Sequence, residues 1–112
     1  IFARVCSYFE SKALRIVDFV GDMSEINGSY HALLELVRKH DCEYMDILCA
    51  GVEETALKGM GFIKKSCGDV IPNYFEPFVP SNVCIKYAVK SVTGRCEAHF
   101  KGDADQDRPN LL

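Results

Sequence analysis

Residues 13–50 read ALRIVDFVGDMSEINGSYHALLELVRKHDCEYMDILCA, and this stretch decides the fold. Residues 13–20 carry apolar side chains on both faces, which is typical of an inner strand. In residues 29–40 the apolar side chains follow the i, i+3, i+4, i+7 spacing of a helix: Tyr30, Leu33, Leu34 and Val37. Residues 44–50 form a compact apolar strand. A strand, an amphipathic helix and a second strand predict a parallel, right-handed βαβ crossover.

The neighbouring segments extend this unit on both sides. Before it, residues 2–9 are rich in β-formers, and Glu10-Ser11-Lys12 reads as a hairpin turn. After it, residues 53–60 read as a short helix with two glutamates in its first turn. Gly61 is placed to end that helix in the left-handed conformation.

The C-terminal half predicts more strands around one irregular segment. Residues 62–65 read as a strand, and residues 83–89 and 96–101 as a final hairpin around Thr93-Gly94. The element order is therefore β-β-α-β-α-β-loop-β-β. We expect one α/β (α+β) domain over residues 1–112, with a mixed, mostly antiparallel sheet of about six strands, two helices, and an irregular acidic tail at residues 102–112.

Net charge, hydropathy and cysteine spacing indicate which partners, metal sites and disulfides to expect. The net charge of -3 argues against nucleic acid or an anionic membrane as a partner. No apolar run approaches the roughly 20 residues that a membrane span needs. The six cysteines include no Cys-x-x-Cys pair and stand mostly in apolar runs, so we expect free thiols in a reducing cytoplasm and no metal site. Because Ile1 reads as the middle of a strand, we expect a fragment of a longer protein.

Residues 54–62 read ETALKGMGF, which resembles the short helix ending in Gly-Phe of GNAT-type N-acetyltransferase domains. Together with the βαβ unit, the resemblance covers residues 13–65, the second half of such a domain. The ending KGDADQDRPN, residues 101–110, is similar to the tail of bacterial proteins with a degenerate, C-terminal GNAT-like domain.

The resemblance implies acyl transfer from acyl-CoA to an amine. A backbone N–H on the strand of residues 44–50 would polarise the thioester, and the helix start would hold the pyrophosphate. The cofactor-binding residues that it implies are Ile47, Leu48, Cys49, Asn27, Gly28 and Ser29. The family's missing first strands would leave a sheet face or edge uncovered, so we expect a homodimer formed through the final hairpin or residues 74–78.

Two departures from the family pattern favour a second function. Residues 21–29 read GDMSEINGS, without the family's Arg/Gln-x-x-Gly-x-Gly/Ala loop and without a basic residue, and Asp22 and Glu25 would repel a pyrophosphate. Leu57 stands where many of these enzymes carry a tyrosine general acid. Acetyl-CoA is thus disfavoured for this chain alone. The alternative is a non-catalytic binding or dimerisation module that has lost the CoA loop.

Two further segments are candidates for a ligand or an interface. Residues 67–82 form a proline-rich segment with Tyr74, Phe75 and Phe78, which either fold back as a lid or anchor an interface. The tail copies the first three positions of a calcium loop but has Arg108 where the glycine belongs. Asp105 and Asp107 therefore read as a solvated or arginine-paired turn, or as a site for a small polar ligand.

Overall fold

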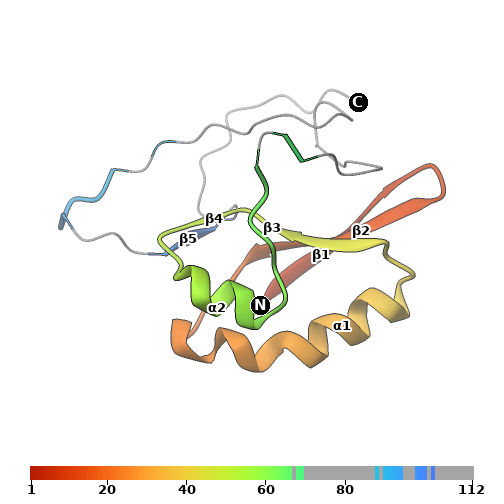
Figure 1. Cartoon of the computed structure of the whole chain (residues 1–112), viewed down its shortest axis with the longest axis horizontal. Helices are drawn as coiled ribbons and strands as arrows, with labels where there is room; N and C mark the ends of the chain where they lie inside the picture. Colours follow the sequence, from red (N-terminus) through yellow and green to blue (C-terminus); the bar gives the residue numbers. More distant parts are fainter. Residues whose placement is uncertain (67, 70–87, 89, 95–97, 101, 103–112) are drawn as a thin grey trace.

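The computed structural model describes residues 1–66, 68–69, 88, 90–94, 98–100 and 102, and within them the chain is a mixed α+β structure (Figure 1). Three strands form one sheet in the order β1-β2-β3, and β4 pairs with β5 in a second. Two α-helices and a 3-10 helix, η1, connect the strands.

The first sheet begins with a hairpin, as expected. β1 (Phe2–Tyr8) runs antiparallel to β2 (Ser11–Asp18), with Tyr8 opposite Ser11. The turn consists of Phe9 and Glu10, so the prediction of Glu10-Ser11-Lys12 was one residue late. Phe9 has a φ of 51°, a left-handed conformation that is rare for a bulky side chain.

The crossover confirms the predicted parallel βαβ unit. α1 (Tyr30–Lys39) matches the predicted helix within one residue at each end, and Leu33 is its buried residue. β3 (Tyr44–Ile47) pairs parallel with β2 from Ala13 opposite Tyr44 to Ile16 opposite Ile47. The Glu43 N–H donates to the Lys12 carbonyl at 2.8 Å, which sets β3 in place beside β2.

The predicted strand of residues 44–50 is divided. Leu48 interrupts it, and β4 (Cys49–Ala50) pairs antiparallel with β5 (His99–Phe100). The chain therefore leaves β2 after Ile47 and joins a different neighbour. The rest of the expected final hairpin lies largely outside the described residues.

α2 (Glu54–Gly59) confirms the second helix, and Gly61, with a φ of 79°, follows it in the left-handed conformation. The expected strand at residues 62–65 is wrong, because this segment has no strand conformation. The Phe62 N–H instead donates to the Leu57 carbonyl at 3.0 Å, in the turn that ends α2. Phe62 packs on the core, so its apolar character reflects a helix end rather than a strand.

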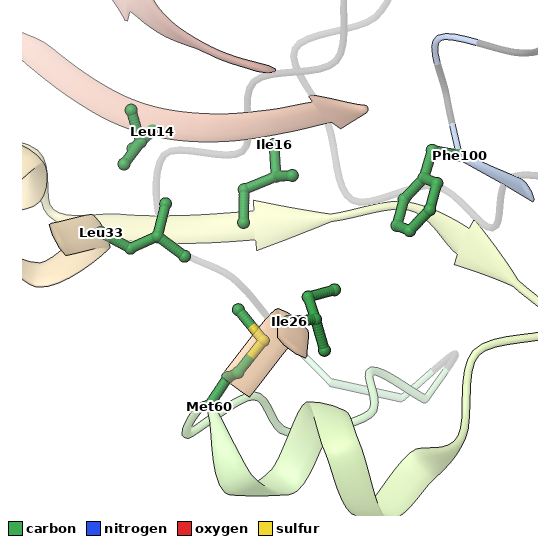
Figure 2. Close-up of a cluster of buried hydrophobic side chains, with 6 residues drawn as sticks. All are labelled: Leu14, Ile16, Ile26, Leu33, Met60 and Phe100. Carbon is green, nitrogen blue, oxygen red and sulfur yellow. The ribbon is translucent and has the colours of Figure 1, made fainter. Parts of the chain in front are cut away.

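Both helices lie on one side of the three-stranded sheet (Figure 1). The core contains side chains from the sheet and from both helical segments. Six buried side chains from five segments meet there (Figure 2). They are Leu14 and Ile16 of β2, Ile26 of η1, Leu33 of α1, Met60 after α2, and Phe100 of β5. No helix of the described part of the chain has the length and apolarity that crossing a membrane requires.

Candidate functional site

The segment that the resemblance assigns to phosphate binding begins with an acid bound to its own backbone. η1 (Met23–Ser29) has Asp22 as its N-cap. One oxygen of the Asp22 carboxylate accepts hydrogen bonds from the Ser24 N–H at 2.9 Å and the Ser24 hydroxyl at 2.8 Å. These bonds, the backbone one foremost, lower the pKa of Asp22. An anionic group of the chain thus occupies the donors at this helix start.

Asn27, Gly28 and Ser29 form the junction between η1 and α1. The Tyr30 N–H donates to the Asn27 carbonyl, so the 3-10 turn runs directly into the α-helix. The Ser29 hydroxyl donates to the Ile26 carbonyl at 2.6 Å and caps no amide of α1. The junction is therefore continuous helical backbone rather than an open, glycine-spaced loop.

α2 lies against this junction. A Cβ added at Gly59 would stand 3.2 Å from the Asn27 side-chain oxygen, and one at Gly61 would stand 3.5 Å from the Tyr30 ring. Ile26 and Met60 are almost wholly buried between the two segments. The space for a side chain is therefore tight at Gly59 but ordinary at Gly61, and the packing brings the Gly-Phe motif and the η1–α1 junction together.

The second group of predicted cofactor residues lies where two strands diverge. Ile47 is the last residue of β3 to pair with β2, and Cys49 already pairs with Phe100 of β5. Leu48 stands between them, half-buried. Burial raises the pKa of the Cys49 thiol, so the thiol form prevails near neutral pH. Ile47 and Cys49 pack on the core cluster that contains Ile26. Ile26 directly precedes Asn27, so both groups of predicted cofactor residues border the same core.

The chain itself occupies the space beside this divergence. A Cβ added at Gly102 would stand 3.1 Å from the Asp18 Cβ and 3.2 Å from the Val17 carbonyl oxygen. The rings of Phe19 and Phe100 have their centroids 6.4 Å apart. Gly102 and Phe100 therefore pack directly against the end of β2.

The candidate ligand or interface residues of the C-terminal half lie outside the described residues: Tyr74, Phe75, Phe78, Asp105, Asp107 and Arg108. Their roles stay predictions. Within the described residues, no cluster of three or more His, Cys, Asp or Glu side chains could hold a metal ion.

Sequence reasoning missed one charged pair in the centre of the sheet. Arg15 of β2 lies opposite Asp46 of β3, on the sheet face that Leu14 and Ile16 do not share. Its Nε donates to Asp46 Oδ1 at 2.9 Å and its Nη2 to Oδ2 at 2.7 Å. The side chains are 6% and 26% exposed, respectively. Asp46 is the single charge of β3, and buried charges are paired, so a cationic partner for it on the neighbouring strand could have been sought from the sequence.

The Arg15–Asp46 pair has a structural consequence. Only the observed register places these residues opposite each other, and a slip of β3 by one residue would move Asp46 to the opposite face from Arg15. The pair therefore specifies the register of β3 on β2.

Comparison of the chain with protein-family models, curated proteins and solved structures found no match in any of the three.

Proposed function

We propose that this chain is a GNAT-like domain that does not catalyse acyl transfer and instead acts as a binding and dimerisation module. The observation that carries the proposal is the Asp22 carboxylate, which accepts from the Ser24 N–H at the start of the helical segment after β2. A CoA pyrophosphate needs free N–H donors and positive potential at that place. The Asp22 carboxylate instead places a negative charge there, and it already accepts from the Ser24 N–H.

The neighbouring residues support the same proposal. Glu25 adds a second exposed acid in the first turn of η1. The junction at Asn27 is packed against Gly59, so opening a phosphate loop there would disturb the contact between η1 and α2. Leu57, in the position of the family's tyrosine, has no proton to donate.

The packing around the end of β3 also supports a domain that does not bind acyl-CoA. In the resemblance, the thioester of acyl-CoA would lie at the backbone of residues 44–50, where the pairing of β3 with β2 ends at Ile47. Here Gly102 lies within van der Waals distance of Val17 and Asp18, and Phe100 is buried in the core. A pantetheine arm would have to displace the chain's own residues and the core contacts that they make.

Acyl transfer from acyl-CoA to an amine is the second candidate, and one observation favours it. The parallel pairing of β2 and β3 stops at Ile16 and Ile47, within the strand whose backbone the resemblance assigns to the thioester. Ile47, Leu48 and Cys49 are half-buried at that point, where an N–H could polarise a thioester.

The test is isothermal titration calorimetry of the chain with acetyl-CoA, with an active GNAT enzyme as the positive control. We expect no binding tighter than about a millimolar dissociation constant. The Asp22→Asn variant keeps an acceptor for Ser24 but removes the charge, and we expect it to stay in that range because Gly102 still fills the divergence. A low-micromolar constant for the unmodified chain would restore the enzyme.

We further propose that the module is a cytoplasmic homodimer. The described cysteines support a reducing compartment, since Cys6, Cys42 and Cys49 are all free thiols. A dimer is supported by the large apolar side chains exposed around the first hairpin, among them Phe2 and Phe9.

A further inference from the structure

The outer strand β1 is exposed and apolar. Within the described residues β1 pairs with β2 alone, and it forms the edge of the sheet. Figure 1 shows the β1–β2 hairpin, in red and orange, reaching past the beginning of β3, whose first residue, Tyr44, pairs with Ala13. Four of the eight exposed large hydrophobic side chains of the described chain lie in residues 1–9: Ile1, Phe2, Val5 and Phe9. An edge of this kind is a template for another strand.

The register of the hairpin identifies which backbone groups point outward. Tyr8 and Ser11 flank the two-residue turn and form the hydrogen-bonded pair that closes it. Hydrogen-bonded and non-hydrogen-bonded pairs alternate from there along an antiparallel ladder. Arg4 and Cys6 therefore direct their backbone groups toward β2, whereas Ala3, Val5 and Ser7 direct theirs to the outer edge.

We propose that β1 is the docking surface for a second copy of this chain, which pairs with it antiparallel about a two-fold axis at Val5. The inference rests on the proposed binding function and names its partner. The pairing joins the two three-stranded sheets into one continuous sheet. Ala3 of each copy then pairs with Ser7 of the other, and Val5 with Val5, which forms about six hydrogen bonds, two for each pair.

The alternative symmetric registers are poorer. Outward-pointing residues must pair with one another, so the axis can stand only at a residue position. An axis at Arg4 sets two arginines directly opposite each other, which is destabilising. An axis at Cys6 pairs Ala3 with the turn residue Phe9, and only Val5 and Ser7 remain, with about four hydrogen bonds. The axis at Val5 opposes Arg4 with Cys6 and uses the full edge.

The turn gives an independent reason for a second copy as the partner. A two-residue turn with positive φ at its first position favours glycine, yet Phe9 stands there at 51° and 89% exposed. In the register about Val5, Phe9 lies opposite Ile1 of the second copy, itself 41% exposed. At each end of the paired β1 strands, the strained Phe9 thus contacts Ile1 of the other copy, which accounts for an aromatic residue at this turn position.

The test is sedimentation equilibrium of the chain over about three decades of concentration, because the dimer fraction follows mass action. We expect the mass to rise from 12.5 kDa toward twice that value. Val5→Pro removes the outward N–H without removing a bond to β2, and Val5→Arg opposes two cations at the axis. Each should raise the dissociation constant by about 100-fold, whereas Val5→Thr keeps the N–H and should stay within about threefold.

Circular dichroism of each variant checks that it folds. If Val5→Pro does not fold, Val5→Arg alone tests the dimer interface. Hydrogen exchange adds a readout of register: dimerisation should slow the amides of Ala3, Val5 and Ser7, while those of Arg4 and Cys6 are protected in the monomer as well. A chain that stays monomeric, or a dimer that both variants leave intact, would overturn the inference. A monomer that does not bind acetyl-CoA would overturn the docking surface and the proposed homodimer, but it would leave the proposed loss of acyl transfer standing. Low-micromolar acetyl-CoA binding would overturn that proposed loss instead.

Discussion

Replacing Asp46 with asparagine should cost more stability than any exposed charge change in this chain. The substitution keeps the shape of the side chain but removes the charge that faces Arg15. Arg15 then keeps a full positive charge on a side chain that is 6% exposed, with a neutral amide in place of a bidentate carboxylate. A buried charge that loses its partner is strongly destabilising.

The magnitude follows from the geometry. Breaking a fully buried pair by removing one partner costs about 3–5 kcal/mol. Because Asp46 is 26% exposed, water can reach the Arg15 guanidinium from that side, and we expect about 2–3 kcal/mol. Replacing both partners by apolar residues, Arg15→Met with Asp46→Leu, should change the free energy of unfolding by only about 0–1 kcal/mol.

Urea denaturation followed by circular dichroism measures the effect. With a slope of about 1–3 kcal/mol per molar urea, the midpoint for Asp46→Asn should fall by about 0.7–3 M. The matched control is Glu54→Gln, which removes the exposed Lys58–Glu54 pair, whose Nζ and Oε1 are 2.8 Å apart. That midpoint should not move measurably, since solvent screens the pair.

A loss below about 0.5 kcal/mol for Asp46→Asn would refute the argument that the pair is buried and coupled. The double variant adds a second criterion. If it lost as much stability as Asp46→Asn, the cost would come from packing at the site and not from an unpaired charge.

Two further predictions concern the segments around the candidate site. Gly61→Ala should lower the stability measured by thermal unfolding by about 1 kcal/mol, because Gly61 has a φ of 79°. Gly28→Ala is the control: a Cβ at residue 28 meets open space, so this variant should not destabilise the fold. Asp22 has a lowered pKa, so its NMR titration midpoint should fall below 3.8. The hydrogen bonds of the ionised Asp22 carboxylate stabilise the fold above pH 3.8 and are lost as the pH falls through the folded-state pKa. The difference in stability between Asp22→Asn and the unmodified chain should therefore narrow on acidification. A difference that does not change with pH would contradict the lowered pKa of Asp22.

The helices and the crossover could be predicted from the sequence because their signals are local. The spacing of Tyr30, Leu33, Leu34 and Val37 describes a single helix face, and Gly61 is the residue that a left-handed helix end requires. Strand, helix and strand in succession allow few arrangements, so the parallel pairing of β2 and β3 followed from their order alone.

The candidate site could be predicted only as a list of segments. The sequence showed two acids and no basic residue between Gly21 and Ser29, where the resemblance would place a phosphate loop, but not that the Asp22 carboxylate accepts from the Ser24 N–H. That bond depends on backbone angles that the residue types leave open. The packing of Gly59 on Asn27 likewise joins elements about thirty residues apart.

The sequence by itself determined the local elements: one hairpin, two helices, and the parallel unit between them. Only the tertiary structure decided that residues 44–50 divide at Leu48, that Phe62 ends a helix instead of beginning a strand, and that Arg15 finds Asp46. The physical reason is that strand partners are chosen by contacts distant in sequence. A short apolar run such as residues 62–65 satisfies a strand or a packed turn equally well until its neighbours are in place.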